Sequence, residues 1–205
     1  MPALPRPPSA PHRLDLAALP AGPLQDDLRE ALHQQRIADA HGHPLLRCEA
    51  LTGTARSLAA AQAWDASETC LSLALQAARQ MLASQDLQAD LLCALAEVCC
   101  TAADAWEAAH RHDDEGPVMP VARHPARDRA HAWAAQAAQQ AAWVSDMAWQ
   151  VQVLRRAADV LERGGELDDA VHLQRQALAL ENPVRPSRRA RVDPALRHAT
   201  PRRAM

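Results

Sequence analysis

Residues 151–183 read VQVLRRAADVLERGGELDDAVHLQRQALALENP, and this stretch decides the fold. In its first half Leu154, Ala158 and Leu161 recur at spacings of four and three, which places them on one face of a helix. The pattern stops at the glycine pair 164–165, where a glycine can adopt the left-handed conformation that ends a helix. The sequence therefore predicts a helix that closes in a tight glycine turn.

A second apolar stripe follows this turn. Asp168 and Asp169 fall in the first turn of the second helix, where the helix dipole favours negative charge. Two amphipathic helices joined by a short turn pack antiparallel, because neither can bury its stripe alone. The stretch is thus expected to form a helical hairpin, with a second stripe made of Leu167, Ala170, Val171, Leu173, Ala177 and Leu178.

The hairpin resembles the tetratricopeptide repeat, a family with a period of about 34 residues. Family members carry small residues where the two helices cross, and Ala158, Ala170 and Ala177 match those positions. Gly165 matches the glycine of the turn, and Leu167 matches the large apolar residue that follows it. The resemblance implies that several such hairpins stack side by side.

Weaker copies of the motif precede the clear one. Sliding the sequence by 103 positions aligns Leu51 with Leu154, and residues 74–86 echo residues 134–146 at an offset of 60. We therefore expect an all-α fold over residues 24–182. Its expected architecture is a right-handed array of about three tetratricopeptide-like antiparallel helical hairpins with an extra N-terminal helix.

Apolar periodicity and helix-breaking residues outline the other elements. Gly116, Pro117, Pro120 and Pro125 interrupt the helical pattern, so we expect a loop insertion at about 112–128. Gly53 lies inside an expected helix, where its missing side chain would let a neighbouring helix approach. Asp86 or Ser84, and Asp146 or Ser145, are expected to cap helices. The helices expected before the hairpin span residues 24–40, 45–63, 67–83, 87–110 and 129–144.

The two ends differ in composition from the body. Residues 1–23 hold seven prolines and no apolar periodicity, so we expect a disordered Pro-rich leader. Residues 183–205 are expected to be a disordered Arg/Pro-rich tail. The body at 24–182 carries 23 acidic residues against 13 arginines, a balance of −10, whereas the tail has seven arginines against Asp193, a balance of +6. An acidic body thus carries a basic tail.

Composition also bears on compartment and source. The chain has no apolar segment long enough to cross a membrane and no signal-peptide pattern, so we expect no membrane association. Its five cysteines follow no disulfide-framework spacing, which favours a reducing, cytoplasmic setting. Lys, Phe and Tyr are absent. Because their codons are AT-rich, a GC-rich bacterial genome is the expected source.

The family resemblance also implies a function. In tetratricopeptide proteins the first helix of each hairpin lines a concave groove that takes a peptide or a partner helix. The resemblance therefore implies a non-catalytic adaptor or regulatory scaffold that binds another protein of unknown identity. The residues best placed to contact that partner are Arg56, Trp149, Gln152, Arg155 and Arg156.

The basic tail supports an alternative function. Arginines neutralise phosphates, so the tail could bind nucleic acid in a salt-dependent way. The acidic body and the lack of aromatic residues in the tail argue against this. GC-rich DNA also translates readily into Arg, Pro and Ala, so the tail could carry no function. The arginines that would serve the alternative are Arg188, Arg189, Arg191, Arg202 and Arg203.

A metal-dependent enzyme is the last alternative. Residues 110–115 read HRHDDE and include two imidazoles and three carboxylates, all possible ligands. However, His110 and His112 are two residues apart and point to different sides of a helix. Cys93, Cys99 and Cys100 lie among apolar residues and are expected to be buried. No catalytic or cofactor-binding motif is present, so we expect neither an enzyme nor a cofactor.

Overall fold

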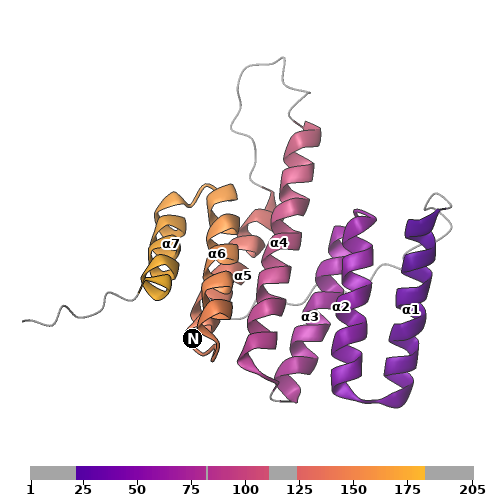
Figure 1. Ribbon diagram of the computed structural model, residues 1–205. Helices are drawn as coiled ribbons and strands as arrows, with labels where there is room; N and C mark the ends of the chain where they lie inside the picture. The colour runs from indigo at the N-terminus through magenta and orange to yellow at the C-terminus, as the bar shows by residue number, and fades with distance from the viewer. Residues whose placement is uncertain (1–21, 82, 111–123, 183–205) are drawn as a thin grey trace, which may run out of the picture.

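The computed structural model describes residues 22–81, 83–110 and 124–182. These ranges form seven α-helices and contain no strand, which confirms the expected all-α class. Figure 1 shows the helices side by side in chain order, with α1 and α7 at opposite ends. The helices are α1 (Pro23–His41), α2 (Pro44–Ala60), α3 (Trp64–Gln80), α4 (Gln85–His110), α5 (Pro125–Ala141), α6 (Met147–Arg163) and α7 (Leu167–Glu181).

The helices pack in adjacent pairs. Each helix contacts the next along the chain, most closely α2 with α3, α4 with α5 and α6 with α7, and α4 also reaches α6. The helix α5 shows why this packing is close, because its inner face is almost entirely alanine. Small side chains let neighbouring helices approach, although each buries little apolar area. The buried alanines of α5 are Ala126, Ala130, Ala134, Ala137 and Ala141.

Several helix ends match their sequence signals. Gly165 has a φ of 86°, the left-handed conformation expected at the turn between α6 and α7. Asp146 caps α6, since its Oδ1 accepts a hydrogen bond from the backbone N of Trp149 at 2.9 Å. Ser84 lies before α4 and accepts from the backbone N of Leu87 at 3.3 Å. Local capping chemistry thus fixes these boundaries.

The expected loop at 112–128 is wrong at its C-terminal end. The helix α5 already begins at Pro125, so residues 125–128 are helical. Proline suits the first position of a helix, where its missing N–H has no intrahelical partner to lose. His124 completes this start, because its Nδ1 accepts from the backbone N of Ala126 at 3.2 Å. Residues 111–123 lie outside the described residues.

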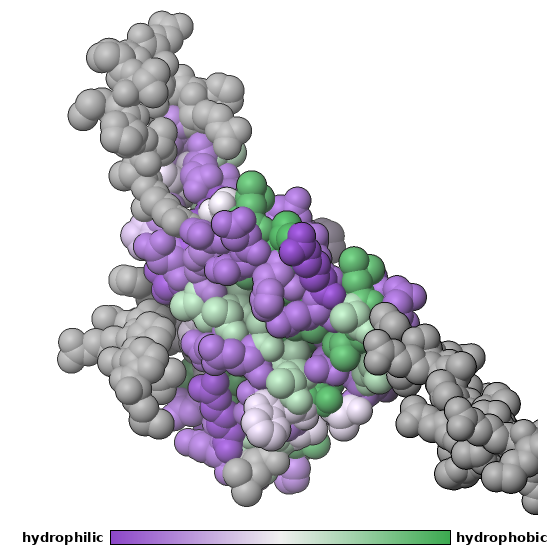
Figure 2. Space-filling model, turned by 90° about the vertical axis from the view of Figure 1, so that its left-hand side faces the viewer, coloured by the Kyte–Doolittle hydropathy of each residue, from purple (hydrophilic) through white to green (hydrophobic). Residues whose placement is uncertain are grey.

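The apolar stripe expected on the second helix of the hairpin is only half buried. Ala170, Leu173 and Ala177 face the core, whereas Leu167, Val171 and Leu178 are 59%, 43% and 52% exposed. Among the described helices α7 packs mainly on α6, which leaves part of its stripe exposed. Figure 2 shows the α7 end of the array, where hydrophobic side chains lie among hydrophilic ones. None of the described helices has the length and apolar character needed to cross a bilayer.

Candidate functional site

A pocket of ≈ 180 Å³ lies where α2, α3, α4 and α6 meet. Its apolar part includes Leu71 and Val98, and its rim carries charged side chains from three different helices. Arg56 belongs to α2, Asp90 and Glu97 to α4, and Arg156 to α6. The structure thus brings together Arg56 and Arg156, two of the residues predicted to contact a partner.

Arg156 is held in place by α4. Its Nε donates to Oε1 of Glu97 at 2.6 Å, and its Nη2 donates to Oε2 of the same carboxylate at 2.9 Å. Its Nη1 also donates to Oδ1 of Asp90. The hydrogen bonds from Arg156 to Glu97 raise the pKa of the guanidinium, and they outweigh the opposing effect of its burial. Arg156 therefore stays charged and ties α6 to α4.

Arg56 differs from Arg156 in its partners. It is exposed and forms no ion pair within the part of the chain that the structure describes. Asp90 and Glu97 bind Arg156 instead. The pocket rim therefore presents one unpaired guanidinium beside a fixed ionic cluster, an arrangement that suits a carboxylate from outside.

Gln152, Trp149 and Arg155 are not part of this pocket. Gln152 is exposed, and Arg155 pairs with Glu181 of α7 at 2.7 Å. Trp149 is partly buried against the core, and its Nε1 is buried with no hydrogen-bond partner. The strongly exposed tryptophan is Trp143, at 73%. Trp149, one of the residues predicted to contact a partner, is therefore packed against the core.

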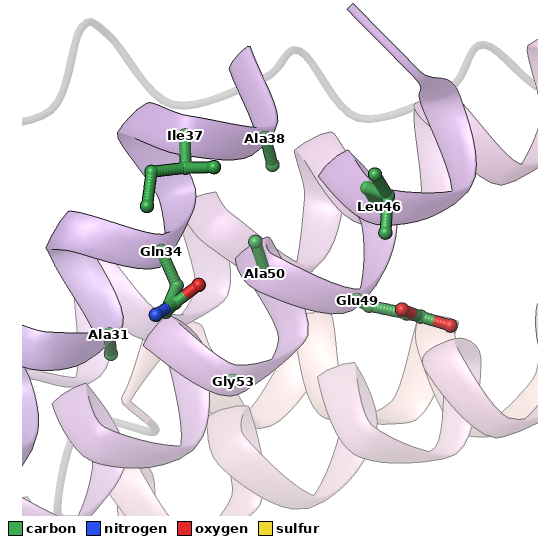
Figure 3. Close-up of a pocket in the computed structure, with 8 residues that line it drawn as sticks. All are labelled: Ala31, Gln34, Ile37, Ala38, Leu46, Glu49, Ala50 and Gly53. Atoms are coloured by element: carbon green, nitrogen blue, oxygen red, sulfur yellow. The ribbon is translucent and has the colours of Figure 1, made fainter. Parts of the chain in front are cut away.

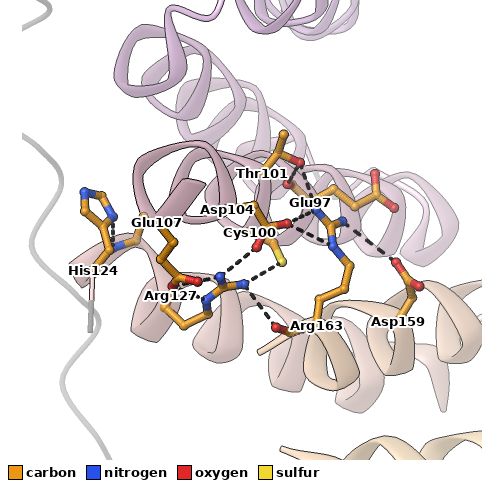
Figure 4. Close-up of polar contacts among 10 residues, drawn as sticks. Glu97, Cys100, Thr101, Asp104, Glu107, His124, Arg127, Asp159 and Arg163 are labelled. Carbon is orange, nitrogen blue, oxygen red and sulfur yellow. Dashed lines mark hydrogen bonds and ion pairs between the residues drawn. The ribbon is translucent and has the colours of Figure 1, made fainter. Parts of the chain in front are cut away.

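A second arginine cluster joins α4, α5 and α6 (Figure 4). Arg127 is only 4% exposed, and its Nη2 lies 2.6 Å from Oδ1 of Asp104 and 2.9 Å from Oε1 of Glu107. Its Nη1 donates to the carbonyl oxygen of Arg163 at 3.3 Å. Arg163 binds the other oxygen of Asp104, so one carboxylate bridges two arginines from different helices.

The sequence analysis does not predict this cluster, although the position of Arg127 in the sequence indicates it. Arg127 precedes Ala130 by three residues and Ala134 by seven, so it continues the inner alanine stripe of α5. A charged residue on a stripe that faces the core needs a partner there. Arg129 makes a similar contact on another side of α5, with its Nε 2.9 Å from Oε1 of Glu68 in α3. Both contacts are structural, because each joins two or more helices.

The cysteines show no sign of reactivity. All five are free thiols, and Cys48, Cys93, Cys99 and Cys100 are buried, as expected for the three in α4. Burial raises the pKa of Cys93 to about 12 and that of Cys70 to about 11. Because the thiolate is the nucleophile and the metal ligand, such thiols are inert near neutral pH.

The described residues contain no group of three His, Cys, Asp or Glu side chains placed to hold a metal ion. His110 stacks on Trp106 with ring centroids 4.1 Å apart. Residues 111–115, the remainder of the suspected metal cluster, lie outside the described ranges. The tail arginines of the nucleic-acid hypothesis also lie outside them, at Arg188, Arg189, Arg191, Arg202 and Arg203.

No family model matches this chain, and no curated protein matches it. The tetratricopeptide resemblance rests on the residues of the hairpin, and the packed helical pairs are compatible with a helical repeat. The functional evidence at the pocket is therefore the chemistry of its own residues.

Proposed function

We propose that this chain is a non-catalytic adaptor that binds a segment of another protein. In this proposal the three helical pairs form a right-handed tetratricopeptide-like array, whose first helices α2, α4 and α6 share one binding face. The supporting observation is the unpaired guanidinium of Arg56 at a pocket that all three of these helices line. The five free thiols fit a reducing cytoplasm.

Binding would proceed by charge pairing over an apolar floor. A partner segment places an aspartate, glutamate or terminal carboxylate on Arg56, and an apolar side chain over Leu71 and Val98. No internal ion pair has to break, because Arg156 already holds Asp90 and Glu97. The rigid ionic cluster therefore fixes the shape of the site before a partner arrives, which lowers the entropic cost of binding.

The proposal is tested by reversing the charge at the pocket. Arg56→Glu should reduce the amount of partner that co-purifies with the tagged full-length chain. Arg79→Glu is the matched control, since Arg79 is an exposed arginine on α3 that does not line the pocket. Equal recovery with both variants would contradict the proposal. Recovery of nucleic acid in place of protein would favour the alternative function of the tail.

A further inference from the structure

A second pocket, of ≈ 320 Å³, lies between α1 and α2 (Figure 3). Ile37 and Ala38 line it from α1, and Leu46 and Ala50 line it from α2. Ile37 and Leu46 are 39% and 46% exposed, so apolar surface on both sides of the pocket faces outward. This pocket shares no lining residue with the one at Arg56.

Gly53 extends the same pocket along α2. A Cβ placed at this position would meet no atom within 4 Å among the described residues. The expected approach of a neighbouring helix is therefore absent from the described structure. Glycine destabilises a helix relative to alanine, and its backbone here shows no positive φ that would require it. Internal packing thus gives no reason for glycine, and the space beside it is open.

We propose that the chain's own residues 13–19, Arg13 to Leu19, occupy this pocket. Their sequence RLDLAAL supplies leucines at 14, 16 and 19, directly upstream of α1. The proposal is independent of the binding site at Arg56. Its occupant is a segment of the leader that precedes the described residues.

The length of chain before α1 fits this occupant. A helix rises 1.5 Å per residue, so Ile37 lies roughly 21 Å along α1 from Pro23. An extended chain covers about 3.3 Å per residue, so Leu16 reaches roughly 20 Å back from Gly22 and Leu14 roughly 26 Å. A segment that returns along α1 therefore brings these two leucines to the level of Ile37 and Leu46.

The covalent tether favours this segment over a separate molecule. Glu49 lines the pocket and forms no ion pair within the described ranges. The segment carries both Arg13 and Asp15, so its net charge is zero and the leucines carry the argument. A segment of the same chain needs less contact area, because a short tether holds it at roughly millimolar effective concentration.

Site-specific cross-linking in the full-length chain tests the proposal. Ile37 is replaced by the photoreactive residue benzoylphenylalanine, and Arg79 is replaced in the same way as an exposed control position. Illumination of dilute protein should link position 37 to residues 13–19 of the same chain, as identified by mass spectrometry, and position 79 should give no such product. Links between two chains, or no excess over the control position, would overturn the proposal.

Two variants separate occupancy of the pocket from mere proximity. Gly53→Leu fills the pocket from α2, and a chain with Leu14→Asp and Leu16→Asp makes the leader polar without altering the helical body. Both should lower the cross-link yield from position 37 severalfold while the circular dichroism of the helices is retained. An unchanged yield in the double leucine variant would show that the leader does not enter the pocket.

Discussion

The guanidinium of Arg127 donates a hydrogen bond from Nη2 to Oδ1 of Asp104 over 2.6 Å, although Arg127 lies on the alanine face of α5. Burial disfavours the charge on Arg127, but its hydrogen bonds to Glu107 and Asp104 outweigh this and raise its pKa. A second hydrogen bond, from Nη1 of Arg127 to the carbonyl oxygen of Arg163, reaches the end of α6. The α4–α5–α6 junction thus depends on an ionic cluster as well as on apolar packing.

Arg127→Met keeps most of the side-chain length and removes the charge. Asp104 and Glu107 then lose a buried partner, and we expect a loss of about 3 kcal/mol in the free energy of unfolding. Arg163→Met is the matched control, because Arg163 is 36% exposed and should cost under about 1 kcal/mol. Urea unfolding measures the free energy of unfolding of both variants. Equal losses in the two would contradict the assigned role of Arg127.

Asp104→Asn tests the cluster through its pH dependence. Burial tends to raise the pKa of Asp104, but hydrogen bonds from Arg163 and Arg127 prevail and lower it. A carboxyl group with a depressed pKa in the folded state stabilises the fold above its unfolded pKa of about 3.9, and this contribution is lost as the pH falls through the folded pKa. The stability difference between wild type and Asp104→Asn should therefore be the same at pH 7 and pH 5 and shrink below about pH 4. Urea titrations of both chains at each pH measure this stability difference. If it already shrinks between pH 7 and pH 5, the pKa of Asp104 is not lowered by the two arginines.

Arg156→Glu is expected to destabilise the fold as well as alter the pocket. It removes the contacts to Asp90 and Glu97 and adds a third negative charge beside them. We expect a lower melting temperature, by roughly 4–8 °C for a loss of about 2 kcal/mol in a chain of this size. Arg155→Glu breaks one exposed pair with Glu181 and should cost under about 1 kcal/mol. Thermal unfolding followed by circular dichroism distinguishes the two, and similar melting temperatures would contradict the bracing role of Arg156.

The helical architecture could be predicted because its signals are local. Leu51 and Ala55 in α2 occupy the positions of Leu154 and Ala158 in α6, and all four side chains are buried. Glycine and capping residues likewise act within a few positions of the helix ends they determine. The sequence pattern favours a loop at Pro125, because proline breaks helices as well as beginning them. Its role follows from the cap at His124, which the sequence pattern does not reveal.

The candidate site was predicted only in part, because its ionic contacts join residues far apart in the chain. Arg156 pairs with Glu97, 59 positions away, and Arg127 pairs with Asp104, 23 positions away. Helical periodicity places a side chain on a face but does not show which residue lies opposite. Arg56 and Arg156, both predicted to contact a partner, lie at one pocket, whereas Trp149, which carries the same prediction, packs against the core.

Deletion of residues 183–205 separates the adaptor proposal from the nucleic-acid alternative. The deletion removes seven arginines and leaves the proposed binding face on α2, α4 and α6 intact. We expect protein capture to be unchanged. The nucleic-acid alternative is tested by the retention of the full-length chain and of the deleted chain on immobilised DNA across a salt titration. If the tail binds phosphates, only the full-length chain should be retained, and its retention should weaken steeply with salt. Loss of protein capture on deletion would place the contact on the tail.

The most direct test of the central claim is quantitative mass spectrometry of proteins that co-purify with tagged full-length wild type, Arg56→Glu and Arg79→Glu. Circular dichroism should first show equal helicity in all three chains. We predict at least one protein that is recovered equally with wild type and Arg79→Glu and is depleted with Arg56→Glu. If every enriched protein is recovered equally with Arg56→Glu and Arg79→Glu, the pocket at Arg56 is not the binding site.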